Sequence, residues 1–253
     1  MAPTGHAQVQ AKLSILLWIE LASDDHGLYV NLFVGCKARV SLGGQQVRLQ
    51  QTTRYPWDGA VRIQLDPDKD AEFDLNLRVP GWCQKAADSN DLYQVLGRPE
   101  NGAFTVKLNG EAVSPLPVEE GYAKLRRTWR AGDVVEIAMA MPARRVKAHP
   151  NVTADKGLVA LMRGPLVYAV ETTGSEFLAG DVFLPPEAPL TADFRSELLG
   201  GVGVLKAGFQ ARFKAEPQAR AVNLEAIPYF CYGNRGKSDL RVWLPEQKPS
   251  ARQ

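Results

Sequence analysis

The chain is a series of short segments in which apolar and polar residues alternate, the period-2 pattern of a β-strand with one buried face. In the clearest segment, FDLNLRV at 73–79, every second residue is apolar, and Pro80-Gly81 follows as a turn. Residues 104–108 alternate in the same way and precede Asn109-Gly110, a dipeptide typical of a type I′ hairpin turn. Both segments are therefore predicted to be half-buried strands.

Similar segments recur along the rest of the chain, at 28–33, 61–65, 134–141, 157–162, 166–170, 227–232 and 240–244. Proline and glycine punctuate the sequence between them, which is the spacing of many short strands and tight turns. This arrangement predicts an all-β fold of antiparallel sandwiches rather than βαβ units. Helix is expected only at Lys12–Leu21 and Ala192–Leu199.

The strand pattern weakens between Arg144 and Asn151, and a chain of 253 residues is long enough for two cores. One strongly twisted sheet seldom holds this many strands. We therefore predict two antiparallel β-sandwich domains, residues 23–146 and 147–253. Residues 1–22 do not share the pattern and are predicted to form a short, atypical N-terminal lead.

Charge and hydropathy narrow the classes of partner. The 30 basic and 28 acidic residues leave a net charge of +2 without a basic block, so a nucleic-acid partner is not expected. The apolar run Ile15–Ile19 is too short to span a bilayer and lacks the flanks of a signal peptide. A cytoplasmic location without a membrane partner is the expectation.

Cysteine and histidine give no motif for a cofactor. The three cysteines are odd in number, far apart and form no CxxC pair: Cys36, Cys83 and Cys231. Such spacing favours reduced thiols over a disulfide framework or a self-contained zinc site. No histidine has a spaced acid or cysteine partner, and the three are His6, His26 and His149. We expect neither a metal ion nor another cofactor.

Seven strings occur in an order that resembles one known family: GLYVNLFVG at 27–35, TRYPWDGAVRIQL at 53–65, LRVPGW at 77–82, VKLNGE at 106–111, GYAKLRRTWRAGDVVEI at 121–137, GLVALMRGPLVYAVE at 157–171, and IPYFCYGNRG at 227–236 followed by RVWLP. Together they resemble the two β-sandwich domains of glycoside hydrolase family 127, the bacterial β-L-arabinofuranosidases. The resemblance covers nearly the whole chain after residue 23.

The resemblance implies that the catalytic residues of that family lie in an (α/α)6 barrel, which precedes the two β-sandwich domains. There a cysteine thiolate attacks the anomeric carbon, a glutamic acid protonates the leaving oxygen, and three cysteines and a glutamate hold zinc. The stretch that precedes GLYVNLF here contains no cysteine. No family catalytic residue is carried over to this sequence. The expectation is a truncated family member, and whether it is an enzyme stays open.

Four residues are candidate carbohydrate contacts: Tyr55, Trp57, Asp58 and Tyr122. Aromatic rings can stack on the CH faces of sugars, and a carboxylate can accept hydrogen bonds from their hydroxyls. The alternative, which we favour, is that YPWDG is an anchored loop used for packing, because buried aromatic residues usually pack. Trp82 and Trp129 lie at strand ends, where a core position is favoured for the same reason.

Two pairs of acids could be proposed as the carboxylates of a glycosidase: Glu119 with Glu120, and Asp133 with Glu136. Glycoside hydrolysis needs its two carboxyl groups about 5 Å apart for retention, or about 6.5–9.5 Å apart for inversion. Adjacent residues of a strand point to opposite faces. We therefore interpret Glu119-Glu120 as a solvated turn.

Three functions remain open at this stage. The first is an accessory module that packs on a glycosidase barrel or pairs with a second copy as a homodimer. The second is a stand-alone carbohydrate-binding module, which requires exposed aromatic residues. The third is a hydrolase with a new site in or between the sandwiches, since a fold does not fix a function.

Overall fold

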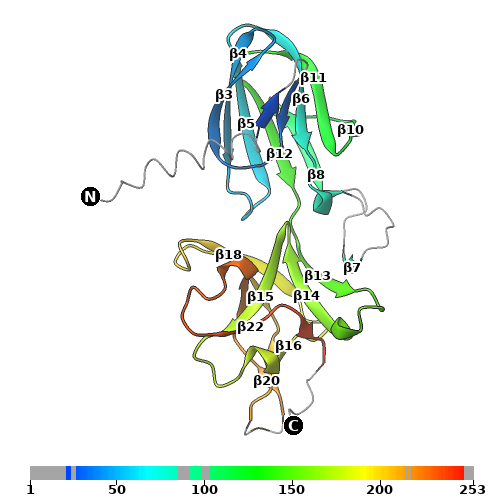
Figure 1. Cartoon of the computed structure of the whole chain (residues 1–253), viewed down its shortest axis with the longest axis vertical. Helices are drawn as coiled ribbons and strands as arrows, with labels where there is room; N and C mark the ends of the chain where they lie inside the picture. Colours follow the sequence, from blue (N-terminus) through cyan, green and yellow to red (C-terminus); the bar gives the residue numbers. More distant parts are fainter. Residues whose placement is uncertain are drawn as a thin grey trace, which may run out of the picture. The chain divides into compact units, whose positions relative to one another are not determined.

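A computed structural model describes residues 21–23, 27–84, 92–97, 103–214, 216 and 218–247, and these residues confirm the all-β class (Figure 1). Over these ranges the regular structure consists of strands and four single-turn 3₁₀ helices. No helix in this part of the chain is long and apolar enough to cross a membrane. Most of the lead, residues 1–20, lies outside the described residues, and Leu21 begins a strand instead of ending a helix.

The second expected helix is wrong. Residues Ala192 to Arg195 belong to strand β17 (Leu190–Arg195), which pairs antiparallel with β18 (Val202–Ala207). Leu199 and Gly200 both have positive φ, 51° and 79°, and end any regular element there. The tight turn between two pairing strands thus outweighs the helical tendency of the short run before it.

The chain divides into two compact units, 1–84 with 102–140, and 85–101 with 141–253. The join therefore falls at Ala140 and Met141, before strand β13 (Ala143–Ala148), whereas the sequence placed it at residue 146. The second unit also receives one strand from the middle of the first: β7 (Tyr93–Val95), which pairs with β13.

The first unit contains two sheets. The five-stranded sheet has the order β1 (Leu21–Ser23), β2 (Gly27–Val30), β6 (Ala71–Arg78), β11 (Tyr122–Trp129) and β10 (Val118–Glu119). The six-stranded sheet has the order β3 (Cys36–Leu42), β4 (Gln45–Thr53), β5 (Ala60–Pro67), β12 (Asp133–Met139), β8 (Phe104–Leu108) and β9 (Glu111–Ala112). Neighbouring strands are antiparallel except β2 and β6, which run parallel.

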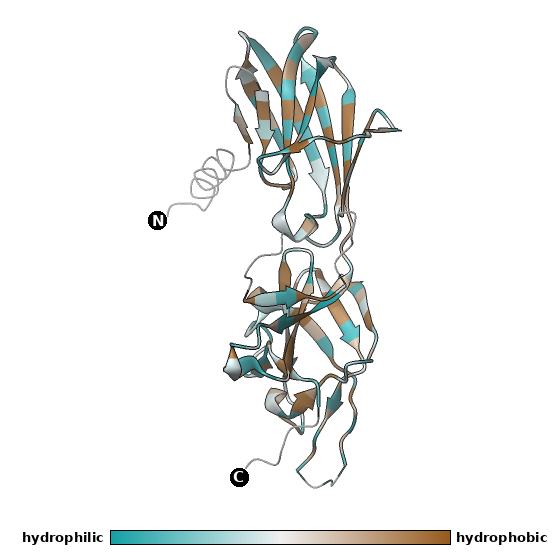
Figure 2. Ribbon diagram, turned by 90° about the vertical axis from the view of Figure 1, so that its right-hand side faces the viewer, coloured by the Kyte–Doolittle hydropathy of each residue, from teal (hydrophilic) through white to brown (hydrophobic). Residues whose placement is uncertain are grey.

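The core of the first unit lies between these sheets, and the alternation read from the sequence supplies it. Hydrophobic and hydrophilic residues alternate along the strands in Figure 2. Leu75 and Leu77 of β6 are fully buried, as are Ile63 and Leu65 of β5 in the facing sheet. Each sheet thus turns its apolar face toward the other, the arrangement of a β-sandwich.

Strand β6 departs from the expected half-buried pattern. Its polar residues Asp74 and Asn76 are only 8% and 5% exposed, so both faces of the strand are shielded from solvent. The Lys124 ammonium lies 3.0 Å from Asp74 and compensates part of the cost of burying this carboxylate. A central strand flanked by β2 and β11 has less access to water than its sequence pattern suggests.

The hairpin turn predicted at Asn109-Gly110 is confirmed. Both residues have positive φ, 49° and 88°, as a type I′ turn requires. Strands β8 and β9 pair on either side of it, with Leu108 opposite Glu111.

The second unit is built on one large sheet, confirming the strand-rich prediction for this half. Its order is β17, β18, β21 (Glu225–Pro228), β15 (Leu166–Thr172), β14 (Leu158–Arg163), β13 and β7, with β22 (Asp239–Arg241) on β15 and β23 (Leu244–Pro245) on β14. A small sheet contains β16 (Val182–Phe183), β19 (Gln210–Ala211) and β20 (Arg220–Ala221). The 3₁₀ turns are η1 (Gly81–Cys83), η2 (Thr153–Asp155), η3 (Ala179–Asp181) and η4 (Tyr229–Cys231).

The second core gathers side chains from both of these sheets. Leu161 and Val170 of the large sheet are buried in the same cluster as Val182 and Ala211 of the small one. The run 227–232, predicted as one strand, instead ends at Pro228 and continues as the η4 turn. Proline lacks the N–H that would continue the ladder, which is the reason for this early end.

We predict that replacing Trp129 with alanine destabilises the first unit by about 3–5 kcal/mol, the cost of truncating a buried aromatic residue. Trp129 is 0% exposed, its ring stacks 5.8 Å from Phe73, and its indole N–H donates to the Phe73 carbonyl at 3.0 Å. Urea denaturation gives the measurement. The control is Thr128→Ala on the same strand, where the exposed side chain should change stability by less than about 0.5 kcal/mol. Equal effects at the two positions would contradict the role of Trp129.

Candidate functional site

The predicted sugar-contact loop YPWDG joins β4 to β5 and is held by its own polar groups. Asp58 accepts a hydrogen bond from the Ala60 backbone N–H at 3.1 Å and lies 3.1 Å from Nε of Arg54. Gly59 is required here, because a Cβ at this position would lie 1.9 Å from the Met139 carbonyl oxygen. The carboxylate of Asp58 therefore fixes the shape of the turn.

Tyr55 packs inward from this loop. Its ring lies edge-on to Phe33 at 5.9 Å, and it contacts the first core together with Trp82. Burial raises the pKa of the Tyr55 phenol, which therefore stays neutral. Of the aromatic residues singled out from the sequence, Trp129 is fully buried, and Tyr55, Trp57, Trp82 and Tyr122 are partly buried.

Tyr122 lies in the other sheet, at the start of β11. Its hydroxyl donates to Asn31 at 2.8 Å, and its ring meets Tyr29 edge-on at 5.5 Å. The Arg78 guanidinium lies 5.4 Å from the same ring. Its phenol and ring thus contact residues 29, 31 and 78, while the YPWDG loop is held by residues 33, 54 and 60. Tyr122 and the YPWDG loop therefore lie in separate environments and share none of these contacts.

Neither acidic pair forms a glycosidase dyad. Glu119 and Glu120 are exposed at the turn between β10 and β11, where Glu120 has a φ of 50°. Asp133 is buried inside the sandwich, whereas Glu136 on the same strand is exposed. The two side chains of this second pair lie on opposite faces of β12, as strand geometry requires for residues three apart.

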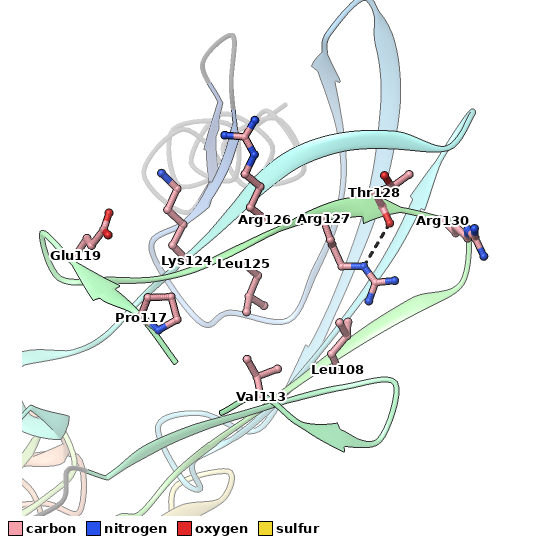
Figure 3. Close-up of a pocket in the computed structure, with 10 residues that line it drawn as sticks. All are labelled: Leu108, Val113, Pro117, Glu119, Lys124, Leu125, Arg126, Arg127, Thr128 and Arg130. Atoms are coloured by element: carbon pink, nitrogen blue, oxygen red, sulfur yellow. Dashed lines mark hydrogen bonds between the residues drawn. The ribbon is translucent and has the colours of Figure 1, made fainter. Parts of the chain in front are cut away.

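The first unit has a groove of about 910 Å³ near strands β8, β10 and β11. Leu108, Val113, Pro117 and Leu125 form its apolar part, and Figure 3 shows Leu125 directed toward Val113. The basic residues around it are Lys124, Arg126, Arg127 and Arg130.

These cations do not make the groove an anion site. Lys124 and Arg126 project from the opposite side of β11 in Figure 3 and pair with Asp74 and Glu72, at 3.0 Å and 3.2 Å. Arg130 lies 3.3 Å from Asp70. Their charge is balanced by acids outside the groove, so its chemistry is mainly apolar.

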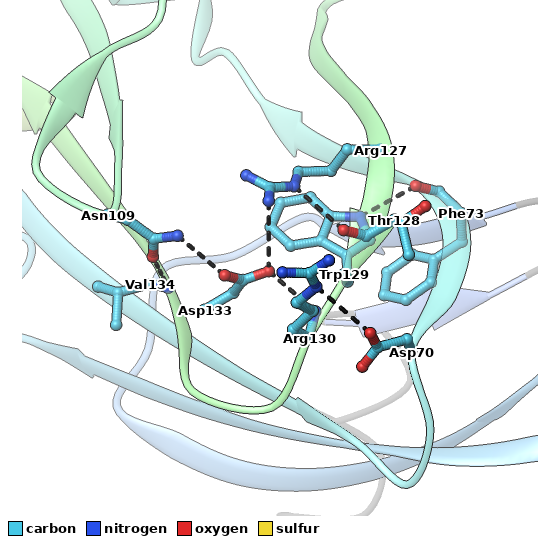
Figure 4. Close-up of polar contacts among 9 residues, drawn as sticks. All are labelled: Asp70, Phe73, Asn109, Arg127, Thr128, Trp129, Arg130, Asp133 and Val134. Atoms are coloured by element: carbon cyan, nitrogen blue, oxygen red, sulfur yellow. Dashed lines mark hydrogen bonds and ion pairs between the residues drawn. The ribbon is translucent and has the colours of Figure 1, made fainter.

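A polar network of the first unit centres on Asp133 (Figure 4). Its carboxylate accepts from the Asn109 amide at 2.8 Å and from the Arg130 backbone N–H at 2.9 Å. Asn109 in turn accepts from the Val134 backbone N–H at 2.8 Å. Arg127 lies 3.8 Å from Asp133 and 5.4 Å from the Trp129 ring. One carboxylate thereby ties together the turns before and beside β12.

The second unit holds a matching network around Glu171. This side chain is fully buried, and it accepts hydrogen bonds from the Ser238 hydroxyl at 2.7 Å and the Gly233 backbone N–H at 3.1 Å. The Arg235 guanidinium donates to its other oxygen at 2.6 Å. Glu171 therefore anchors the loop that follows η4 to the large sheet.

Both carboxylates are held in the ionised form. For each, burial raises the pKa, but hydrogen bonds and neighbouring cations outweigh it and hold the pKa below its ordinary value. The hydrogen bonds come from Asn109 and Arg130 for Asp133, and from Ser238, Arg235 and Gly233 for Glu171. A general acid for glycoside hydrolysis needs the opposite shift.

The η4 turn and Tyr232, which precede the loop held by Glu171, carry an aromatic surface that the sequence pattern does not predict. Tyr229, Phe230 and Tyr232 are 53%, 63% and 43% exposed. The apolar run at 227–232 predicts a strand, in which half of these side chains would be buried. The signal that could have revealed them is Pro228, which ends the strand before the run begins.

The cysteines have no shared site. All three are thiols, with Cys83 and Cys231 buried and Cys36 partly buried. Burial raises the pKa of the Cys231 thiol, which makes it a poor nucleophile. Within the described ranges, no group of three or more His, Cys, Asp and Glu side chains is arranged to hold a metal ion. His149 accepts from the Asn151 N–H at 3.2 Å, and His6 and His26 lie outside those ranges.

Comparison with known proteins gives a consistent result. A family model described as the middle domain of the family 127 β-L-arabinofuranosidases matches residues 27–141, and the C-terminal domain model of glycoside hydrolase family 127 matches residues 143–245. A non-reducing end β-L-arabinofuranosidase of Bifidobacterium longum subsp. longum is 28% identical over 218 residues, 77% of this chain.

Two solved structures are similar over most of the chain. The family 127 β-L-arabinofuranosidase Ara127N of Geobacillus stearothermophilus T6 is 35% identical over 95% of the chain, with a TM-score of 0.78. A second family 127 β-arabinofuranosidase is 33% identical over 90% of the chain, with a TM-score of 0.81. The chain spans 30% of the curated relative and 37% and 36% of the two solved chains.

The Glu171 network predicts a pH dependence of stability. Its folded pKa lies below the ordinary value of 4.5, so its contribution is present above about pH 4.5 and is lost as pH falls through the folded pKa. Glu171→Gln should lower stability at neutral pH by about 3 kcal/mol and flatten this acid slope, because an amide leaves the Arg235 charge without its partner. Urea midpoints measured from pH 3 to 7 test this, with exposed Glu119→Gln as the control. An unchanged slope in Glu171→Gln would contradict the assignment.

Proposed function

The chain belongs to glycoside hydrolase family 127, and on this premise we propose that its two β-sandwich units are accessory domains that pack on a family catalytic barrel and support carbohydrate processing. The observation that carries the proposal is the match itself. It assigns residues 27–141 and 143–245 to the middle and C-terminal domains of the family.

The chemistry of the buried acids supports this proposal. A glycosidase acid must be protonated before it acts, which requires a raised pKa. Asp133 and Glu171 have lowered pKa values and use their oxygens to hold turns and loops. These carboxylates therefore suit a structural role better than a catalytic one.

The aromatic surface at Tyr229, Phe230 and Tyr232 supports packing on another body. Contiguous exposed aromatic residues are typical of protein interfaces, because they bury a large apolar area for little loss of side-chain freedom. The chain spans 37% and 36% of the two similar solved chains, so a larger body accompanies these domains in the relatives. We propose the catalytic barrel as the partner of this surface.

A stand-alone carbohydrate-binding function of the first unit has less support from the geometry. Tyr122 is engaged with Asn31 and Tyr29, and Tyr55 packs inward on Phe33. A sugar platform needs aromatic faces that are open to solvent and belong to one surface.

We predict that the purified chain hydrolyses no chromogenic β-L-arabinofuranoside above the protein-free rate, with or without added zinc. A family relative that includes the barrel is the positive control for the substrate. Elemental analysis is expected to find less than stoichiometric zinc in the same preparation. Turnover that a single carboxylate or cysteine substitution abolishes would overturn the accessory function.

We also predict that the chain associates with itself when no barrel is present, with a homodimer as the simplest closed assembly. Light scattering at micromolar concentration should give a mass above that of the monomer. The double variant Tyr229→Ser/Phe230→Ser should shift this mass toward the monomer, because it removes exposed apolar area. Val118→Ser, at a position 50% exposed on β10, should leave it unchanged. A monomeric wild-type chain would contradict the prediction.

A further inference from the structure

Two hollows of the second unit adjoin one another. Each has a volume of about 370 Å³, and both are lined by Ser175, Asn223 and Leu224. The first also contains Glu171, Thr173, Arg195, Glu225 and Arg235, and the second contains Phe177, Phe213, Arg220 and Val222. We call the two together the double cleft. Each hollow has the size of a site for a small ligand, roughly 300–1,000 Å³.

The first hollow is polar but electrically balanced. Glu171 pairs with Arg235, and Arg195 lies 3.5 Å from Glu225. Lys206 lies 3.8 Å from Glu225 and also pairs with Asp193. The cations are matched by carboxylates, so the hollow has no excess charge to hold phosphate or sulfate. Its hydroxyl, amide, carboxylate and guanidinium groups instead suit a neutral ligand that both donates and accepts hydrogen bonds.

Glu171 acts in this hollow as a positioning residue. Its carboxylate already accepts from Gly233, Ser238 and Arg235, so it has little capacity left for a ligand. It fixes the Arg235 guanidinium, whose side chain is 29% exposed. A guanidinium has five N–H donors, and its Nε and Nη2 face Glu171, which leaves further donors for a ligand.

The second hollow supplies apolar surface. Phe177 meets Phe213 edge-on at 5.2 Å, and the Arg220 guanidinium lies 3.8 Å above the Phe213 ring. This stack fixes the wall of the hollow, and Phe177, Val222 and Leu224 are partly exposed beside it. A pyranose or furanose ring has one edge of hydroxyls and one face of C–H groups, which is the combination that the double cleft offers.

We infer that the double cleft binds a neutral, hydroxyl-rich ligand, with one sugar unit in each hollow, so that its ligand is a disaccharide segment of a glycan. The inference deepens the proposed role in carbohydrate processing and rests on it for the choice of sugars to test. Asn223 lies at the junction of the two hollows, where an exposed amide can donate and accept toward both units.

Isothermal titration of the full chain tests this inference with an arabinose disaccharide, L-arabinose and inorganic phosphate as ligands. The disaccharide should bind saturably and about tenfold more tightly than L-arabinose, and phosphate should not compete. Asn223→Ala should weaken disaccharide binding about tenfold, since it removes hydrogen bonds of a ligand group. The matched control is Thr191→Ala, an exposed position of β17 outside the double cleft, which should bind like the wild type.

Several results would overturn the inference: no saturable sugar binding, competition by phosphate, or an Asn223→Ala affinity equal to that of the wild type. This test is independent of the test of the accessory function. Titration decides whether the double cleft binds a sugar, and the turnover assay decides whether the chain is an accessory module. Hydrolysis by the chain would contradict the accessory function and leave the titrations of Asn223→Ala to decide the double cleft. Absence of both hydrolysis and sugar binding would uphold the accessory function and remove the double cleft.

Discussion

The two units depend on one constraint, which is that the backbone donors of tight turns must find acceptors when the turns are packed against a sheet. Each unit meets it with a buried carboxylate: Asp133 accepts from the Arg130 N–H beside β12, and Glu171 accepts from the Gly233 N–H after η4. In both places an arginine compensates the buried charge. Turns fixed in this way allow short strands to keep their register.

This use of the acids bears directly on function. A carboxylate that holds several donors is stabilised as an anion, and the same bonds that lower its pKa occupy the lone pairs a substrate would need. A catalytic role and a structural role therefore compete for the same carboxylate oxygens. Most of the hydrogen-bonding capacity of the Glu171 carboxylate is used within the protein. Glu171 therefore affects a ligand indirectly, through the guanidinium of Arg235 that it holds in place.

The sequence patterns predicted the fold well where burial was one-sided. The alternation at 61–65 and 104–108 became β5 and β8, and Asn109-Gly110 formed the expected turn. The patterns failed where a neighbouring element decided the outcome. The burial of Asp74 depends on the strands beside β6, and the strand at Ala192 depends on pairing with β18. Neither partner is visible in a local window of sequence.

The candidate site was harder to predict, for a related reason. Aromatic residues are natural candidates for ligand contacts in a sequence, but Tyr55 and Trp129 mainly pack in the core between the two sheets of the sandwich. The groups that meet in the double cleft come from segments as distant as Glu171, Arg195 and Arg235. Glu171 on β15 and Arg195 on β17 belong to one sheet through β21 and β18, and Arg235 reaches Glu171 from the loop after η4. Such a constellation has no spacing motif. Binding a neutral ligand requires polar and apolar groups in the right geometry and no matched pKa, so neither a spacing motif nor a titratable residue marks this surface in the sequence.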